Sequence, residues 1–199
     1  METIWGKMSL ELTALNLQQK LSGYEKILLD LGTGDGRFVR SKSEEHKDQF
    51  FIGIDACREN LHLNSRRILP NALFVIASAQ ALPHELDGLI SHVNINFPWG
   101  SLLESLLSDD TALITRLLSV TRRCASLDIF LNAEALVTAG YTFESGADQI
   151  LGALNAAGWK LKSCSLLDTN SLRSFPSTWA KRLAFGRNPR AVQLSLQRE

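Results

Sequence analysis

Carboxylates and glycines alternate in one short stretch of the chain that could hold a charged ligand. Residues 27–31 form an apolar run that includes Asp30, and glycines follow at positions 32, 34 and 36. An apolar run without alternation that ends in turn residues is typical of a buried parallel strand. Glycine tolerates positive φ and lets a ligand lie against bare backbone. The stretch therefore predicts a buried strand, a sharp turn and a ligand next to that turn.

A second acid follows a second short apolar run, because Asp55 comes directly after residues 50–54. A glycine-rich turn, a helix, a strand and a terminal acid form the first half of a nucleoside-binding α/β unit, whose acid accepts hydrogen bonds from the ribose. The order of residues is D-x-G-x-G-x-G, and Asp30 and Asp35 would repel the diphosphate of a dinucleotide. A ligand with an ammonium and a sulfonium fits better. The sequence therefore predicts S-adenosylmethionine as cofactor; a glycine-rich turn without a ligand is the alternative.

Two tryptophans stand where large rings commonly line a site. Trp99 lies between a proline and a glycine after a predicted strand, and Trp179 lies among hydroxyl and basic residues. Residues 159–199 carry eight basic and two acidic residues, a net charge of +6, whereas residues 1–158 carry −6. A chain polarised in this way can present one basic face to phosphates. The C-terminal part is therefore a candidate surface for nucleic acid.

Composition limits the remaining possibilities. The 199 residues suffice for one domain with a full core, and no apolar run approaches the roughly 20 residues that span a bilayer. The N-terminus lacks the pattern of a signal peptide, and the three cysteines and four histidines show no disulfide or metal-ligand spacing. We therefore expect a monomeric cytoplasmic protein that binds neither a membrane nor a metal ion.

Predicted strands and helices alternate along the chain. Strands are expected at about 26–31, 50–54, 72–76, 89–95, 124–131, 159–167 and 191–196, and helices at about 12–24, 36–47, 57–68, 101–122 with a break at 108–110, and 149–157. Residues 3–11 are expected to form an N-terminal β-hairpin, residues 132–148 a polar linker, and residues 168–190 an irregular basic loop. The pattern predicts an α/β fold with a seven-stranded, doubly wound, Rossmann-like sheet whose last strand is antiparallel. The loops at 30–36, 55, 77–80, 96–101 and 168–187 should meet at the carboxyl ends of the strands.

Three segments resemble one family: residues 30–37 (DLGTGDGR), 97–104 (FPWGSLLE) and 179–187 (WAKRLAFGR). They are similar to the Kam/Npm-type aminoglycoside-resistance methyltransferases, and the likeness extends over nearly the whole chain. The resemblance implies a class I S-adenosylmethionine-dependent methyltransferase fold. It also implies methylation of N1 of adenine 1408 in the decoding site of 16S rRNA, in helix 44 of the 30S ribosomal subunit. That modification blocks several aminoglycosides.

The same resemblance implies roles for particular residues. Trp99 and Trp179 are expected to clamp the target base. The residues expected at the cofactor are Asp30, Gly32, Thr33, Gly34, Gly36, Asp55, Ala77, Ser78, Gln80, Asn96, Ser101 and Ser177, and those expected at rRNA phosphates are Lys181, Arg182, Arg187 and Arg190. The chain departs from the family pattern in having Gln80 in place of glutamate, Asn96 in place of an apolar residue, and a short segment at 132–148.

The expected chemistry needs no general base. Adenine N1 is a neutral nucleophile that has to be placed in line with the methyl–sulfur bond. A stacked base must first be flipped out, and two indole faces can hold it and favour the positive charge it gains. Residues 96–99 (NFPW) also resemble the [DN]-P-P-[YFW] loop of enzymes that methylate exocyclic amines. Methylation of adenine N6, another RNA methyltransferase activity, a small-molecule methyltransferase and a non-catalytic RNA-binding module are the alternatives.

Overall fold

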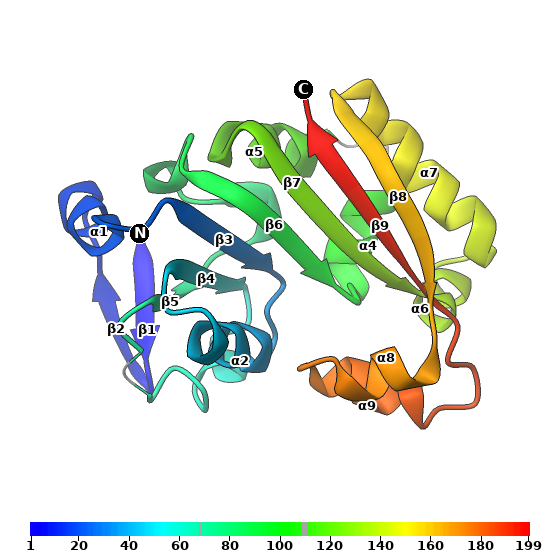
Figure 1. Cartoon of the computed structure of the whole chain (residues 1–199), viewed down its shortest axis with the longest axis horizontal. Coiled ribbons are helices and arrows are strands. Elements are labelled where there is room, and N and C mark those ends of the chain that lie inside the picture. The colour runs from blue at the N-terminus through cyan, green and yellow to red at the C-terminus, as the bar shows by residue number, and fades with distance from the viewer. Residues whose placement is uncertain (68, 109–110) are drawn as a thin grey trace.

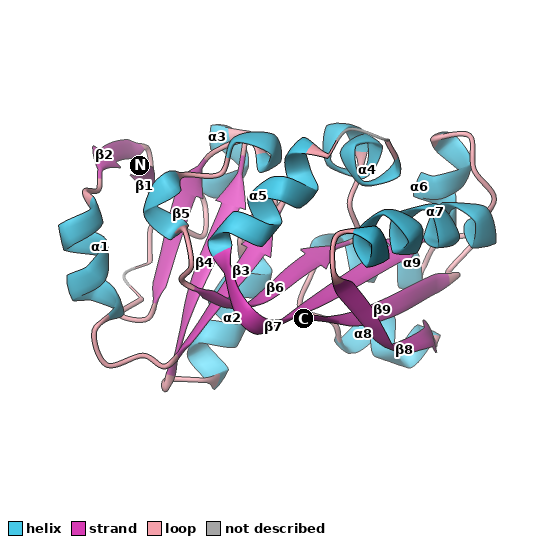
Figure 2. Cartoon of the chain, turned by 90° about the horizontal axis from the view of Figure 1, so that it is seen from above, coloured by secondary structure: helices cyan, strands magenta, loops and turns pink. Residues whose placement is uncertain are grey.

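The computed structural model describes residues 1–67, 69–108 and 111–199. Across these ranges the chain forms one nine-stranded sheet with helices on both sides (Figures 1 and 2). The strand order is β2-β1-β5-β4-β3-β6-β7-β9-β8. The strands are β1 (Glu2–Trp5), β2 (Met8–Glu11), β3 (Lys26–Leu31), β4 (Gln49–Asp55), β5 (Ala72–Ile76), β6 (Ile90–Asn96), β7 (Thr121–Asn132), β8 (Trp159–Leu167) and β9 (Ala191–Arg198).

The helices divide between two apolar clusters on the sheet and a third at its edge. They are α1 (Ala14–Leu21), α2 (Arg37–Glu45), α3 (Arg58–Leu61), α4 (Gly100–Leu107), α5 (Ala112–Val120), α6 (Ala133–Thr138), α7 (Phe143–Ala156), α8 (Thr169–Ser174) and α9 (Thr178–Ala184), with short 3₁₀ turns η1 (Ala79–Ala81) and η2 (His84–Leu86). Helices α1 and α4–α7 contribute to the largest cluster, and α2 and α3 pack in a smaller one. Helices α8 and α9 form the third cluster with Phe97 and Phe130.

Strand directions place a switch point at the centre of the sheet. Strands β5, β4, β3, β6 and β7 run parallel, and β3 has β4 on one side and β6 on the other. Ligands of doubly wound sheets bind where the strand order reverses in this way. Strand β9 lies antiparallel between β7 and β8, which confirms the predicted direction of the last strand.

The predicted count of seven strands is wrong, since nine strands form the sheet in the described residues. Strands β1 and β2 pair antiparallel with each other, and β1 also joins the sheet where Thr3 pairs with Val75. Ile4 on β1 is buried in the cluster that includes Phe51 and Phe74. This burial explains why the first two strands extend the sheet and do not stand apart from it.

Several predicted helix boundaries are also wrong. The helix expected over 57–68 spans only Arg58–Leu61. The helix expected from 149 already begins at Phe143, because the Thr142 side chain accepts from the backbone of Ser145 and the Ser145 hydroxyl accepts from Thr142 in return. Helix α6 fills most of the remaining segment, so residues 132–148 are not a linker. The break expected at 108–110 lies partly outside the described residues; α4 ends at Leu107 and α5 starts at Ala112.

The segment expected to be an irregular basic loop contains two helices. The Asp168 side chain accepts from the backbone of Ser171 and begins α8, and Ser177 is the residue before α9. Ala180, Leu183 and Ala184 bury one face of α9. Figure 1 shows this helix pair beyond the ends of β6 and β7, joined to the sheet by β8 and β9.

Other features follow the sequence closely. Trp159 is fully buried at the start of β8, as expected for a core residue. In the part of the chain that the structure describes, no helix is both long and apolar enough to traverse a bilayer.

Candidate functional site

A cavity of about 660 Å³ opens at the carboxyl ends of the central strands. This size falls within the roughly 300–1,000 Å³ of small-molecule sites. Its walls come mainly from residues 30–35, 54–57, 77–80, 96–99, 101–102 and 177–179 together with Arg182, so each predicted loop contributes to it. The residues expected at the cofactor all line the cavity except Gly36, which lies outside the described lining.

Asp30 is a buried carboxylate on the floor of the cavity, with 3% of its surface exposed. Its oxygens accept hydrogen bonds from the Thr33 hydroxyl and, at 2.8 Å, from Asn96 Nδ2. Burial raises the pKa of Asp30 to about 7; these two hydrogen bonds oppose the shift, and the charges of Asp55 and Asp35 add to it. An uncompensated buried carboxylate is costly, and a cationic ligand group beside it removes that cost.

Asn96 presents an unused acceptor next to Asp30. Its Nδ2 donates to Asp30, while its buried Oδ1 has no hydrogen-bond partner among the described residues. Buried polar atoms are nearly always paired in native proteins, so an orphaned acceptor in a cavity points to a ligand donor. The α-ammonium of a methionine moiety offers both the positive charge for Asp30 and an N–H for Asn96. The residues present therefore fit S-adenosylmethionine.

Asp55 holds the glycine turn against the end of β4. Its Oδ2 accepts from Gly34 N at 2.8 Å, and its Oδ1 accepts from Cys57 N at 2.8 Å and Asn60 Nδ2 at 3.3 Å. A carboxylate has about four lone-pair sites, so these three bonds leave one for a ligand hydroxyl.

Glycine is required at the three positions of the turn for different structural reasons. All three have positive φ. A Cβ at Gly32 would lie 2.5 Å from Leu102, and one at Gly36 would lie 2.5 Å from Phe74, so both positions are closed by packing. A Cβ at Gly34 would meet no described atom within 4 Å, which leaves this backbone bare toward the cavity. Gly36 was expected at the cofactor; it instead lies directly before α2 with its backbone close to the Phe74 ring of β5, where no room is left for a side chain.

Trp99 and Trp179, 80 residues apart in sequence, stack on each other at one side of the cavity. Their ring centroids are 5.5 Å apart and their planes differ by 27°. Trp99 is half-buried at the start of α4, whereas Trp179 is 42% exposed at the start of α9. The arrangement gives the cavity a pair of stacked aromatic faces.

A strained turn aims Trp99 at the cavity. Phe97 has φ of 52°, a left-handed conformation that costs a bulky residue about 1–2 kcal/mol. Its side chain is buried, with ring centroids 5.8 Å from Phe130 and 5.4 Å from Phe175. This aromatic packing holds the turn, and Phe175 carries the same cluster over to the α8–α9 pair.

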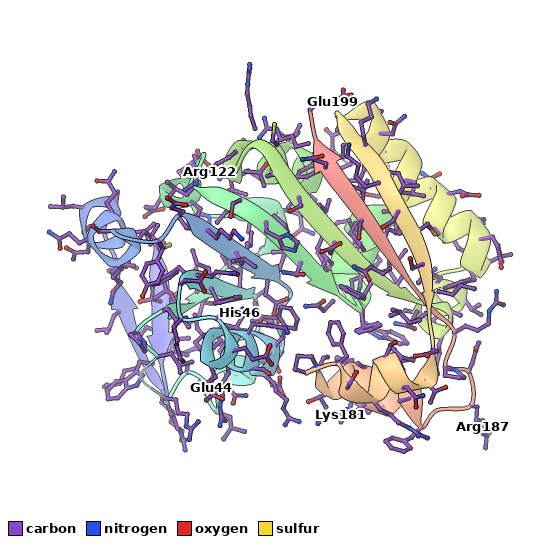
Figure 3. All side chains as sticks on the ribbon, in the orientation of Figure 1. Glu44, His46, Arg122, Lys181, Arg187 and Glu199 are labelled. Atoms are coloured by element: carbon purple, nitrogen blue, oxygen red, sulfur yellow. The ribbon has the colours of Figure 1, made fainter. Side chains whose placement is uncertain are left out.

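The basic residues of the C-terminal segment do not all lie at the cavity. Arg182 lines it, with its guanidinium 5.2 Å from the centre of the Trp179 ring. Lys181 and Arg187 are exposed on the outer side of the α8–α9 segment, outside the described lining (Figure 3). Arg190 instead bonds Glu144 at 2.8 Å and lies over the Phe143 ring. Of the four expected phosphate ligands, only Arg182 is brought to the tryptophan pair.

Thr178 is a cavity residue that the sequence analysis missed. Its hydroxyl donates to Asp35 Oδ2 at 2.9 Å, joining the start of α9 to the glycine turn across 143 residues of sequence. Its position between Ser177 and Trp179 is the one signal that could have drawn attention to it.

We expect Thr178→Val to misplace Trp179. A hydrogen bond to a charged group contributes about 1.5 kcal/mol at the lower end, so the methyl transfer that the sequence predicts should fall roughly tenfold. The stacked indoles should give a couplet in far-ultraviolet circular dichroism, and the variant should weaken it. Thr138→Val, which removes a hydroxyl that donates to the Glu134 carbonyl on α6, serves as the control. An undiminished couplet in Thr178→Val would contradict this role.

A doubly wound sheet with an antiparallel β9, the buried Asp30 at its switch point and a cavity of about 660 Å³ are the features of an α/β methyltransferase-like fold. A family model described as NpmA, 16S rRNA (adenine(1408)-N(1))-methyltransferase, matches residues 2–198. The chain therefore belongs to this family of rRNA methyltransferases. Membership confirms the predicted family and enzyme class, with S-adenosylmethionine as methyl donor.

Individual relatives are similar over nearly their full lengths. A 16S rRNA (adenine(1408)-N(1))-methyltransferase from Escherichia coli is 30% identical over 203 residues, which cover 92% of this chain and 91% of the relative. The crystal structure of the 16S rRNA methyltransferase KamB has a TM-score of 0.90 at 25% identity, with complete coverage of both chains. That of the aminoglycoside-resistance methyltransferase NpmB1 has a TM-score of 0.81 at 28% identity, also with complete coverage.

Proposed function

We propose that this protein methylates N1 of adenine 1408 in 16S rRNA within the 30S subunit, and that it thereby protects the ribosome from aminoglycosides. The observation that carries the proposal is the stacked pair Trp99 and Trp179 beside a cavity that contains the buried Asp30 and the partly exposed Asp55. Two large aromatic faces next to an exposed arginine suit a flat base that is attached to a phosphate backbone. The protein acts as a monomer in the cytoplasm on helix 44 of the assembled subunit.

The cofactor is held by groups that match its α-ammonium and its ribose. Asp30 and Asn96 bind the α-ammonium, and Asp55 accepts from a ribose hydroxyl. The remaining lining residues with a proposed cofactor contact are Gly32, Thr33, Gly34, Ala77, Ser78, Gln80, Ser101 and Ser177. Each offers a backbone or side-chain group at the cavity wall.

Trp99 and Trp179 hold the flipped adenine by its two faces. Stacking on an aromatic side chain contributes about 1–3 kcal/mol per base. S-Adenosylmethionine, when bound, supplies a methyl group on a positively charged sulfur. The two indoles orient N1 toward that methyl group, and no side chain has to accept a proton because N1 of neutral adenine carries none. The same ring faces favour the positive charge of the methylated base.

Exposed cations outside the cavity contact rRNA phosphates. We expect Lys181→Ala and Arg187→Ala each to weaken 30S binding and to reduce its salt dependence by about one charge, with cofactor affinity unchanged. Arg190→Ala should have a smaller effect because Glu144 already pairs with it. Arg122 lies at the opposite end of the sheet (Figure 3), so Arg122→Ala is the control for binding measured over a salt series. Equal losses in Arg122→Ala and Arg187→Ala would contradict this surface.

The proposal is tested with purified 30S subunits, the protein and S-adenosylmethionine labelled in its methyl group. We expect label in 16S rRNA and a reverse-transcriptase stop next to position 1408, because a methyl group on N1 blocks base pairing. Nucleoside mass spectrometry should give 1-methyladenosine. N6-methyladenosine without a stop, or label only in small molecules, would overturn the assignment.

A further inference from the structure

The Gln80 carboxamide at the cavity wall is bonded at both of its ends. Its Nε2 donates to Ser105 Oγ, and its Oε1 accepts from Ser78 Oγ, which also accepts from Gln80 N at 3.2 Å. A carboxamide presents a donor at one end and an acceptor at the other, so its orientation decides what it can recognise. A glutamate at this position would have two equivalent oxygens and would need no orienting neighbour.

Ser105 determines this orientation because its hydroxyl has a single hydrogen, which is already donated elsewhere. Its hydroxyl donates to the Ser101 carbonyl at 2.7 Å, one helical turn earlier in α4. It can therefore only accept from Gln80, which requires the amide NH₂ to face Ser105. The Gln80 carbonyl is then turned to the other side, where Ser78 occupies one of its two lone pairs. One lone pair stays available for a ligand in the cavity.

We propose that Ser105 is a positioning residue that makes Gln80 an acceptor for the 6-amino group of the cofactor's purine. The inference rests on the proposed cofactor contact of Gln80. Ser105 itself lies outside the described lining of the cavity, so it acts through Gln80 alone. A 6-oxo purine sets a carbonyl against the Gln80 carbonyl and leaves both unpaired. Sites built around a hydrogen bond reject such analogues strongly, because a buried group then loses its partner.

The experiment compares two ligands by calorimetry on the full-length protein: S-adenosylhomocysteine and its 6-oxo analogue, S-inosylhomocysteine. The wild type should prefer the 6-amino ligand by at least about tenfold. Ser105→Ala releases the amide, so this preference should fall to about threefold or less. Ser119→Ala is the matched control, because Ser119 donates to the Thr115 carbonyl with the same helical spacing. It should keep the wild-type ratio.

The ratio of the affinities for the two ligands distinguishes a positioning role of Ser105 from a role in packing alone. A structural defect in Ser105→Ala weakens both ligands alike and keeps the ratio, which would overturn the proposal. In a Gln80→Glu background the carboxylate needs no orientation, so adding Ser105→Ala should leave the ratio unchanged; a further loss there also counts against it. No preference in the wild type overturns the role of the Gln80 carbonyl. If neither ligand binds the wild type, the cofactor site itself is wrong, which is a separate failure.

Discussion

Asn in place of Asp30 is expected to weaken cofactor binding about a hundredfold while making the ligand-free protein more stable at pH 8. The loss of affinity follows from removing a buried negative partner of the ammonium, worth about 3 kcal/mol. Asp30 is 3% exposed and accepts from Thr33 and Asn96. Asparagine has the same shape and carries no charge that burial can penalise.

The pH dependence of this effect has a definite sign. Because the folded pKa of Asp30 is raised to about 7 from an ordinary value of 3.8, the folded protein binds the extra proton between these values. The contribution of Asp30 to the stability of the folded protein is fully present below about pH 4 and is lost as the pH rises through 7. The free energy of unfolding that Asp30→Asn gains over the wild type should therefore grow from pH 5 to pH 8, with a ceiling on the order of 4 kcal/mol.

Denaturant unfolding at the two pH values checks this prediction, with Asp128→Asn as a control of opposite sign. Burial alone favours the neutral form of Asp128, but hydrogen bonds from His92 and Ser195 outweigh it and lower the pKa. Asp128→Asn should therefore destabilise the protein at pH 8. An Asp30→Asn protein that is less stable than wild type at pH 8, or that binds the cofactor normally, is incompatible with the proposed site.

Alanine in place of Trp99 or Trp179 is expected to reduce methyl transfer to 30S subunits by up to about a hundredfold. Each change removes one face of the clamp, worth up to about 3 kcal/mol of stacking that positions N1. Cofactor affinity should change less than about threefold, since the acids that hold the cofactor stay in place. Because Trp99 also packs against the main core, Trp99→Phe is the conservative variant and should recover part of the rate.

Single-turnover methylation and calorimetry together distinguish a role of the tryptophans in holding the target base from a role in binding the cofactor. Trp5→Ala is the matched control, because Trp5 is 44% exposed and its Nε1 donates to the Arg66 carbonyl away from the cavity. It should keep the wild-type rate. Parallel losses of cofactor affinity and methylation in both clamp variants would assign the tryptophans to the cofactor pocket.

The stacked pair has to open before a base can enter. A purine between two rings requires ring planes about 7 Å apart, twice the contact spacing of roughly 3.5 Å. The observed centroid separation is 5.5 Å. Trp99 directly precedes α4 and packs against the main core, whereas Trp179 is exposed at the first turn of α9. Opening is therefore expected to displace Trp179 together with the start of α9.

The core of the fold and the floor of the site were predictable because their signals are local. Buried strands such as β3 and β4 are continuous apolar runs, and glycines and acids follow them directly. The topology of a doubly wound sheet then brings all these turns to one edge. Asp30, Asp55 and Asn96 could thus be placed in one cavity from sequence.

The features of the fold and the site that the sequence did not predict depend on contacts between residues distant in the chain. The pairing of Thr3 with Val75, which makes β1 part of the sheet, has no local signature. Helix α9 is short. It is stabilised by its buried alanines and Leu183, which share an apolar cluster with Phe97 and Phe130. The bond from Thr178 to Asp35 and the stacking of the two tryptophans arise from this packing as well.

Methyl transfer to 30S subunits that carry guanine in place of adenine 1408 tests the central claim most directly. N1 of guanine bears a hydrogen and is not a free nucleophile, so two indoles that deliver this one base should leave the altered subunits unlabelled. Normal subunits should accept close to one methyl group each. Equal labelling of both would show that the enzyme modifies another nucleotide, and the clamp as described would be wrong.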